Sequence, residues 1–212
     1  MGRNLDSKCS QCRREGEKLF LKGEKCFGPK CPIVRRNYPP GVHGQSKHGG
    51  KKSAFGYGKQ LREKQKVKRS YGLMERQFSN YVELARHKKG DAGVIFRQLL
   101  EMRLDNVVFR LGLGKSRAHA RQAVGHGLMQ VNGKNVDIPS FQVKIGDVIS
   151  WNPLSKGAKM NEGLSEKLQK HNTPAWLSMD AAALSGKVLS MPQITDFDLS
   201  FDTKHIIEFY SR

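Results

Sequence analysis

Branched aliphatic side chains are distributed unevenly along the chain. Residues 1–60 contain six Ile, Leu or Val residues, whereas residues 104–149 contain fourteen. A segment with so little apolar surface cannot offset its conformational entropy by burial alone. We therefore expect the middle of the chain to build its own small core, and the N-terminal part to need a metal ion, a partner or both.

A helical pattern of apolar positions covers residues 91–111. Asp91 is a candidate N-cap for a helix that runs to about Arg103, and the helical period continues from Asn106 to Leu111. We expect one face of this pattern to be buried, because four apolar side chains share it: Leu104, Val107, Val108 and Leu111.

A second helix is predicted from Arg117 to His126, after a turn that contains Gly112 and Gly114. Ser116 is its candidate N-cap. The two helical segments form a helix–turn–helix arrangement. Basic side chains stand near the start of the second helix, where free backbone amides also attract anions.

A β-hairpin is predicted next. Asn132-Gly133 stands between two short alternating runs, residues 128–131 and 134–138, and this dipeptide is typical of a tight hairpin turn. A further strand is predicted from Asp147 to Trp151. Residues 91–152 are therefore expected to form a small α/β module of two helices and a mostly antiparallel sheet.

The segment before this module contains a glycine-rich basic stretch. Residues 41–58 (GVHGQSKHGGKKSAFGYG) hold too many glycines for a helix. We expect an extended loop that orders on its partner, with Phe55 and Tyr57 available to stack on bases. A plain flexible linker is the alternative.

Two helices are predicted between this loop and the module. Residues 59–70 (KQLREKQKVKRS) carry six Lys or Arg and one Glu. Because like charges repel one another, we expect RNA phosphates to relieve the repulsion. An amphipathic helix follows, with apolar side chains at i, i+4, i+7 and i+11: Met74, Phe78, Tyr81 and Ala85.

Composition adds a strong charge asymmetry. The 212 residues include 38 Lys and Arg against 19 Asp and Glu, a net charge of +19. Residues 1–90 carry +16 of this and residues 91–212 carry +3. Such an excess favours polyanionic partners, and nucleic acid is favoured over an anionic membrane surface. No stretch approaches the roughly 20 apolar residues of a membrane helix and no secretory leader is visible, so we expect a cytoplasmic protein.

All four cysteines fall in one short window, as Cys9-x2-Cys12 and Cys26-x4-Cys31. Two close pairs separated by a loop match a tetrahedral four-thiolate site. We expect a structural Zn²⁺, with an iron–sulfur cluster or no metal as alternatives. Disulfides are disfavoured in a cytosolic protein.

No enzymatic motif is evident. Gly114-Lys115-Ser116 resembles the end of a phosphate-binding loop, but Phe109 stands where that motif needs its first glycine. The sequence also lacks the H-E-x-x-H, G-x-S-x-G and G-x-G-x-x-G patterns. The histidines have no paired acid or nucleophile, so we expect polar contacts rather than catalysis from them.

Longer motifs make a family resemblance specific. Residues 103–112 (RLDNVVFRLG), 116–117 (SR), 120–122 (ARQ), 126–127 (HG) and 131–133 (VNG) resemble the RNA-binding module named after small-subunit ribosomal protein S-four. The rest of the chain resembles the bacterial ribosomal family itself, of the type that keeps a cysteine knuckle. These matches are residues 38–41 (YPPG), 43–44 (HG), 61–66 (LREKQK), 71–72 (YG), 75–78 (ERQF), 174–177 (PAWL) and 207–212 (IEFYSR).

The resemblance implies an α+β fold: an N-terminal metal knuckle of four cysteines, a helical domain, and an inserted small α/β RNA-binding module. It also implies a structural constituent of the small ribosomal subunit that binds small-subunit ribosomal RNA and helps nucleate assembly of the subunit body. Ribosomal protein S-five and messenger RNA, where it enters the subunit, are the implied neighbours.

Four parts of the chain are expected on this basis. They are a metal-binding extension with the four cysteines (residues 1–45), a basic loop and helical domain (46–90), the module (91–152), and a C-terminal segment that packs back on the helical domain (153–212). Residues 153–172 match least well, and we expect a helix there.

We expect RNA contacts from basic side chains in both halves of the chain. In the module these are Arg103, Lys115, Arg117, Arg121 and Lys134. In the N-terminal half they are Arg13, Arg14, Arg35, Arg36, His43, Lys47, Lys51, Lys52, Arg62, Lys66 and Arg69.

Two other functions fit parts of the sequence. An RNA-modifying or tRNA-charging enzyme can carry the same module, but it needs a catalytic domain of some hundred residues, and only about sixty follow the module. A zinc-dependent DNA-binding regulator should show base-reading side chains in a dimeric frame, and no dimerisation heptads are seen. RNA is instead read largely through shape, phosphates and 2′-hydroxyls.

Overall fold

The computed structural model describes residues 6–45, 56–152, 168–169, 171–197 and 201–211. It divides the chain into two compact units, one of residues 1–96 and 199–212 and the other of residues 97–198. No helix in the described part of the chain is long and apolar enough to cross a membrane. The helix expected within residues 153–172 lies largely outside the described residues.

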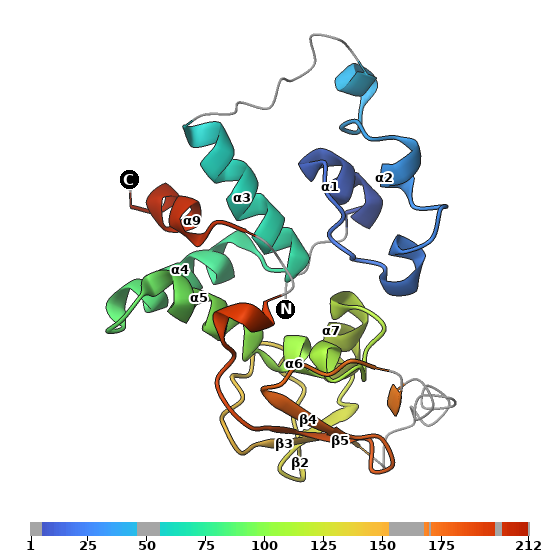
Figure 1. The fold of residues 1–212 in the computed structure, drawn as a ribbon, viewed down its shortest axis with the longest axis vertical. Helices are drawn as coiled ribbons and strands as arrows, with labels where there is room; N and C mark the ends of the chain where they lie inside the picture. The colour runs from blue at the N-terminus through green and yellow to red at the C-terminus, as the bar shows by residue number, and fades with distance from the viewer. Residues whose placement is uncertain (1–5, 46–55, 153–167, 170, 198–200, 212) are drawn as a thin grey trace. The chain divides into compact units, whose positions relative to one another are not determined.

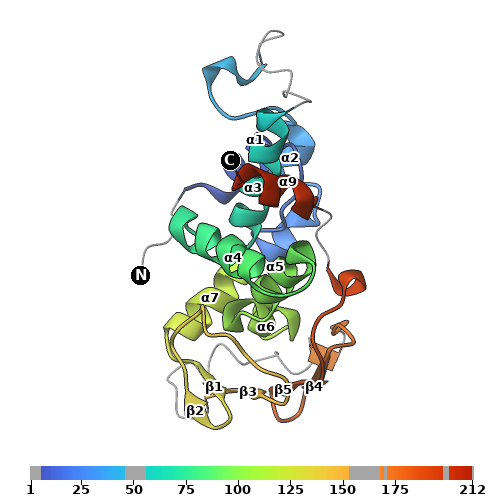
Figure 2. The same cartoon turned by 90° about the vertical axis from the view of Figure 1, so that its left-hand side faces the viewer.

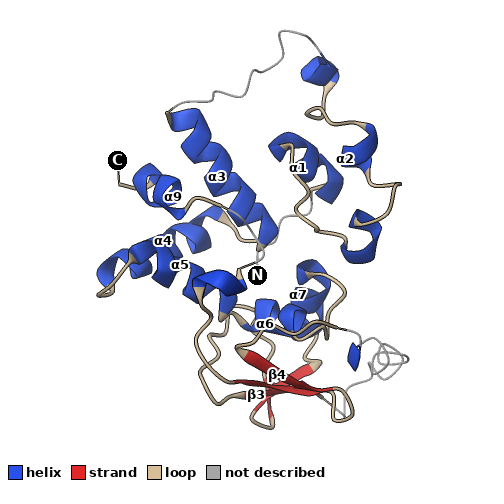
Figure 3. Ribbon diagram, viewed as in Figure 1, coloured by secondary structure: helices blue, strands red, loops and turns tan. Residues whose placement is uncertain are grey.

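The first unit is helical in all its described elements (Figure 3). These are α1 (Lys8–Glu15), η1 (Gly23–Cys26), α2 (Pro32–Arg35), η2 (Val42–Gln45), α3 (Tyr57–Ser70), α4 (Glu75–His87), the start of α5 (Ala92–Glu101) and α9 (Thr203–Phe209). The C-terminal α9 lies beside α3 (Figure 1). Tyr57, which was expected to stack on RNA bases, packs on Phe209, with the ring centroids 5.4 Å apart, and is still 54% exposed.

The amphipathic helix α4 buries a slightly different face from the predicted one. Phe78 and Ala85 are buried as expected, and Phe78 meets Phe96 edge to face with centroids 5.3 Å apart. Val82 is buried in place of the predicted Tyr81, which is half-buried. Met74 is exposed because it precedes the helix in extended conformation.

The second unit consists of short helices and one antiparallel sheet. Its elements are α6 (Leu104–Arg110), α7 (Arg117–Gly125), β1 (Met129–Val131), β2 (Lys134–Asn135), β3 (Val148–Trp151), β4 (Leu177–Asp180), β5 (Ser185–Val188) and η4 (Ile194–Asp196). The strand order is β2-β1-β3-β5-β4. Figure 2 shows α6 and α7 together on one face of this sheet.

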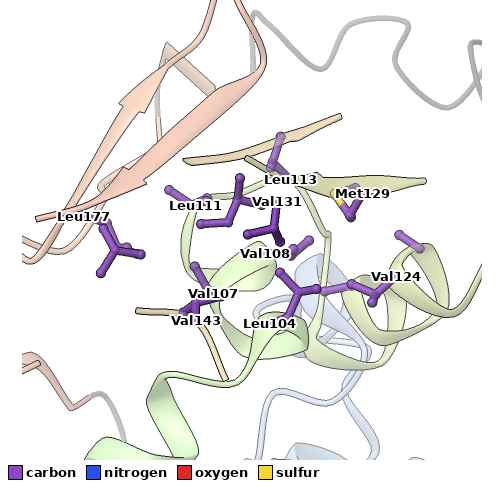
Figure 4. Close-up of a cluster of buried hydrophobic side chains, with 14 of the residues drawn as sticks. Leu104, Val107, Val108, Leu111, Leu113, Val124, Met129, Val131, Val143 and Leu177 are labelled. Atoms are coloured by element: carbon purple, nitrogen blue, oxygen red, sulfur yellow. The ribbon is translucent and has the colours of Figure 1, made fainter. Parts of the chain in front are cut away.

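The core of the second unit lies between α6, α7 and the sheet. The predicted face of Leu104, Val107, Val108 and Leu111 is fully buried, and it meets side chains such as Met129 and Val131 (Figure 4). Leu111 packs so closely on β5 that a Cβ added at Gly186 would lie 2.3 Å from it. A side chain at this position of the strand would therefore require Leu111 to shift.

Local signals at the ends of elements are confirmed. Ser116 accepts a hydrogen bond of 3.2 Å from the backbone N–H of His119, as an N-cap should. Asp91 accepts one of 2.7 Å from Gly93. Asn132 and Gly133 have φ values of 51° and 77°, which is the left-handed pair that a tight hairpin turn requires.

Two boundaries differ from the prediction. Helix α5 ends at Glu101, because Arg103 adopts an extended conformation and forms a bridge with Gln142. The expectation that all of residues 153–212 pack back on the helical domain is wrong for β4 and β5. These strands extend the sheet of the second unit, and Leu177 and Val188 help to complete its core. Within the first unit, α9 does pack on α3.

Candidate nucleic-acid interface

A buried ionic network holds the start of α6. Arg103 Nε and Nη2 lie 3.0 and 2.7 Å from the two oxygens of Asp105, and Arg121 approaches the same carboxylate at 3.5 Å. Arg103 is 0% exposed. This burial does not favour the prediction that Arg103 contacts RNA: in the described structure its guanidinium pairs with Asp105 in the interior of the module.

A second buried network links α5 to α6 and α7. Glu101 accepts two hydrogen bonds from Arg110, at 2.9 and 3.0 Å, and one of 2.8 Å from the amide of Asn106. Asn106 Oδ1 in turn accepts a bond of 2.8 Å from Nε of Arg117, whose guanidinium lies 4.6 Å from the ring centre of Phe109. These contacts orient the half-buried Arg117 at the first turn of α7.

The other basic residues of the module are more accessible. Lys115 is exposed at the N-terminal end of α7, and Arg121 stands one turn beyond Arg117 on the same helix face. Burial, and then the charge of Lys115, lower the pKa of His119, so His119 is neutral at pH 7. Lys134 is exposed on the hairpin, away from these positions in sequence.

The basic helix α3 is neutralised mainly by carboxylates of its own unit. Arg62 lies 3.4 Å from Glu15, and Arg69 also binds Glu15, whose side chain is 2% exposed. Lys66 lies 2.7 Å from Glu17 and 3.5 Å from Glu63. These acidic side chains already relieve part of the repulsion on this helix, a role that was expected of RNA phosphates.

Glu75, at the start of α4, is the fourth carboxylate that binds basic side chains of α3. Its carboxylate lies 2.6 Å from Lys64 and 2.7 Å from Lys68, and it accepts a bond of 2.6 Å from the hydroxyl of Tyr210. Burial raises the pKa of Glu75, but these three partners outweigh it and lower the pKa to about 2. Burial and the carboxylate raise the pKa of Tyr210. The chain end is thereby tied to α3 and α4.

The remaining candidates in the N-terminal half divide into three groups. Arg13 is structural: it donates to the carbonyls of Arg36 and Tyr38, at 3.2 and 3.0 Å, and lies over the Tyr38 ring. Four others are exposed: Arg14, Arg35, Arg36 and His43. Three lie outside the described residues: Lys47, Lys51 and Lys52.

The four cysteines come together around one small cavity. Cys9, Cys12, Cys26 and Cys31 line a space of about 10 Å³, and none forms a disulfide. The backbone N–H of Lys22 donates to the sulfur of Cys26 at 3.4 Å. Burial and the three neighbouring cysteines raise the pKa of Cys12. As the side chains stand, no group of three or more His, Cys, Asp or Glu in the described part of the chain is arranged to hold a metal ion.

Comparison with known proteins decides the family. The family model described as Ribosomal protein S4/S9 N-terminal domain matches residues 3–101, and the one described as S4 domain matches residues 102–149. "Small ribosomal subunit protein uS4" of Acetivibrio thermocellus is 50% identical over 212 residues, which is 100% of both chains. The proteins of the same name from Ruminiclostridium cellulolyticum and Nitrosospira multiformis are also 50% identical over the full length of both chains. The chain belongs to the uS4 family.

Further exposed basic residues of this uS4-family chain lie on and after α4 and were not expected from the sequence. Arg76 is exposed, as are Arg86, Lys88 and Lys89 around the end of that helix. The signal available in the sequence is the run of residues 86–89 (RHKK) just before a glycine, which is typical of a solvated turn. These residues add to the positive surface of the first unit.

Proposed function

We propose that the chain is a structural, non-enzymatic constituent of the small ribosomal subunit, located in the cytoplasm, which binds small-subunit ribosomal RNA directly. The observation that carries this proposal is the 50% identity, from end to end, with proteins named as small ribosomal subunit proteins. The net charge of +19 supports it, because RNA is the polyanion that such an excess fits.

The RNA contacts that we propose are the exposed or half-buried basic side chains that internal carboxylates do not fully occupy. Arg117 is the best-oriented of them, since Asn106 and Phe109 hold its guanidinium. Its guanidinium keeps a positive charge that attracts a phosphate. The others are Arg14, Arg35, Arg36, His43, Lys115, Arg121 and Lys134. We also propose Lys47, Lys51 and Lys52, on the basis of the sequence alone, because they lie outside the described residues.

The family resemblance extends the proposal to assembly and neighbours. We propose that the chain binds early, helps nucleate assembly of the subunit body, and lies beside ribosomal protein S-five near the channel through which messenger RNA enters. The described surface leaves several exposed apolar side chains on the second unit, including Phe141, Ile145 and Leu189, which a protein neighbour could cover.

We also propose that Cys9, Cys12, Cys26 and Cys31 hold a structural Zn²⁺, with an iron–sulfur cluster as the alternative. The chemistry of the donors supports this proposal: four thiol sulfurs line one cavity, and four thiolates are the donors of a closed tetrahedral zinc site, although these side chains would have to shift to bind the ion. Bound metal would link α1 to α2 and supply folding free energy to a segment with a small core.

Metal analysis tests the zinc proposal. The purified protein should contain about one zinc per chain, and Cys26→Ser should abolish it, because three thiolates leave the tetrahedral shell incomplete. A metal-free protein whose N-terminal segment resists proteolysis as well as the metal-loaded protein would refute the proposal.

Association with ribosomes tests the main proposal. A tagged chain expressed in bacterial cells should co-sediment with small ribosomal subunits and remain bound through a wash at moderate salt. A triple variant tests the proposed contacts of the module. With Arg117, Arg121 and Lys134 replaced by Gln, the chain should be retained on the subunits less well than the wild type. A wild-type chain that stays at the top of the gradient would contradict a ribosomal role.

A further inference from the structure

Two aromatic side chains in the cysteine-containing segment are exposed rather than buried. Phe27 is 73% exposed, the highest value among the aromatic side chains of the described residues, and Phe20 is 38% exposed. Their ring centres are 5.0 Å apart, with the planes inclined by 31°. Both rings stand outside the small apolar cluster of this segment, which consists of Cys12, Leu19, Leu21, Cys31 and Ile33.

The backbone is arranged to hold this pair outward. Leu19 and Leu21 are both buried, at 1% and 8% exposure, while Phe20 between them adopts a left-handed φ of 50°. L side chains rarely adopt this conformation. The turn continues with a bond of 3.4 Å from Gly23 N–H to Phe20 O, and the short helix η1 then brings Phe27 beside Phe20.

The surroundings of the pair are positively charged. Lys22, Lys25 and Lys30 are exposed within three residues of one ring or the other. The acidic residues in the same range are Glu24 and Glu17, and Glu17 pairs with Lys66. Phe27 contacts Phe20 on one side and still exposes most of its surface, so its other side is open. An open aromatic face with exposed lysines nearby in the sequence matches an unpaired nucleotide, whose base offers a π-face to the ring and whose phosphate can meet the lysines.

We propose that Phe27, supported by Phe20, is a stacking platform for an unpaired base of small-subunit ribosomal RNA, with Lys22, Lys25 and Lys30 meeting the adjacent phosphates. This inference rests on the proposed function and adds a specific contact to it. The platform differs from the phosphate contacts of the module, because stacking carries no net charge and so leaves the salt dependence of binding unchanged.

The test compares full-length variants for binding to small-subunit ribosomal RNA transcribed in vitro. Phe27→Ala should bind about 5- to 150-fold more weakly, the range that alanine substitution of a base-stacking aromatic produces, with the salt slope of the wild type. Phe27→Trp should bind within about threefold of the wild type, since it restores an aromatic face. Leu84→Ala, at an exposed apolar side chain of the same unit, is the matched control and should bind normally.

Chemical probing of unpaired bases provides the second readout. The wild type and Phe27→Trp should protect one unpaired base that stays reactive with Phe27→Ala. If Phe27→Ala binds as tightly as the wild type and protects the same bases, the platform is refuted while direct RNA binding stands, and a protein or membrane partner for the pair becomes the better explanation. If the wild type itself does not bind this RNA, both proposals fail.

Discussion

Oδ1 of Asn106 accepts a hydrogen bond of 2.8 Å from Nε of Arg117. Asn106 is buried and its own amide is held by Glu101, so the direction of Arg117 is set by residues of α5 and α6. The basic side chain at the start of α7 is thus pre-oriented before RNA arrives. This reduces the side-chain entropy lost on binding.

Substitution of Arg117 should separate orientation from charge. Arg117→Lys keeps the charge but loses the bond to Asn106 and the planar group over Phe109. We expect its affinity for small-subunit ribosomal RNA to fall about two- to tenfold, with an unchanged salt slope. Arg117→Ala should also make the slope shallower by about 0.7–0.9. A lysine variant that binds like the wild type would show that orientation contributes nothing.

Arg103 should matter for stability rather than for RNA binding. Arg103→Ala leaves the carboxylate of Asp105 buried with Arg121 as a more distant partner, at 3.5 Å. We expect the free energy of unfolding, from urea titration, to fall by about 3–5 kcal/mol. The double variant Arg103→Met with Asp105→Leu should recover part of this loss, because the buried carboxylate is gone and the guanidinium that loses it, Arg121, is partly exposed. A stable Arg103→Ala variant with weakened RNA binding would contradict its assignment to the interior.

Glu15 should be the main electrostatic link between α1 and α3. Its buried carboxylate is shared by Arg62 and Arg69, so Glu15→Gln leaves two guanidinium groups without this charged acceptor. We expect a loss of about 1.5–3 kcal/mol in the free energy of unfolding. Glu17→Gln is the control: Glu17 is 54% exposed beside Lys66 and should cost less than about 1 kcal/mol. Equal effects of the two substitutions would refute the special role of Glu15.

Because Glu75 binds Lys64, Lys68 and Tyr210, the free energy of unfolding should fall in acid. The folded-state pKa of Glu75 is about 2, below the value of about 4.3 for an unfolded glutamate. Its contribution is therefore complete above about pH 5 and is lost as the pH falls from about 4.3 through 2. Since the side chain is half exposed, the contribution should not exceed about 1 kcal/mol.

Urea midpoints at about pH 6 and about pH 2.5, on either side of the pKa of an unfolded glutamate, test this dependence. They should differ less for Glu75→Gln than for the wild type, because glutamine has no proton to gain. Glu83→Gln, at an exposed position of the same helix, is the control and should match the wild type. A Glu75→Gln variant with the full acid loss would contradict the role of this carboxylate.

The parts of the fold that could be predicted from the sequence are the local ones. The caps at Asp91 and Ser116 and the turn at Asn132-Gly133 act within a few residues, so the helix–turn–helix and the hairpin follow from short-range chemistry. Strands β4 and β5 were missed. Their runs are short and contain small residues, and β5 pairs with β3 across a long stretch of chain.

The candidate site was also only partly predictable from the sequence. The composition indicates that basic residues should bind a polyanion such as RNA, but it does not show which of them already pair with carboxylates of the chain. Glu15 and Arg69 are 54 positions apart, and only the packing of α1 on α3 brings them together. The sequence alone could not show that Arg103 is buried, because an arginine two positions from an aspartate also occurs as an exposed ion pair. The exposure of Phe27 likewise depends on the turn at Phe20.

Direct binding to RNA as a function of salt tests the central claim most directly. The full-length chain is titrated against small-subunit ribosomal RNA and against an unrelated structured RNA of the same length, between about 50 and 400 mM KCl, a range over which phosphate contacts weaken strongly. The account predicts tighter binding to the ribosomal RNA at every salt concentration, with the logarithm of the affinity falling linearly by about 0.7–0.9 per phosphate contact. Equal affinity for both RNAs across this range would contradict it.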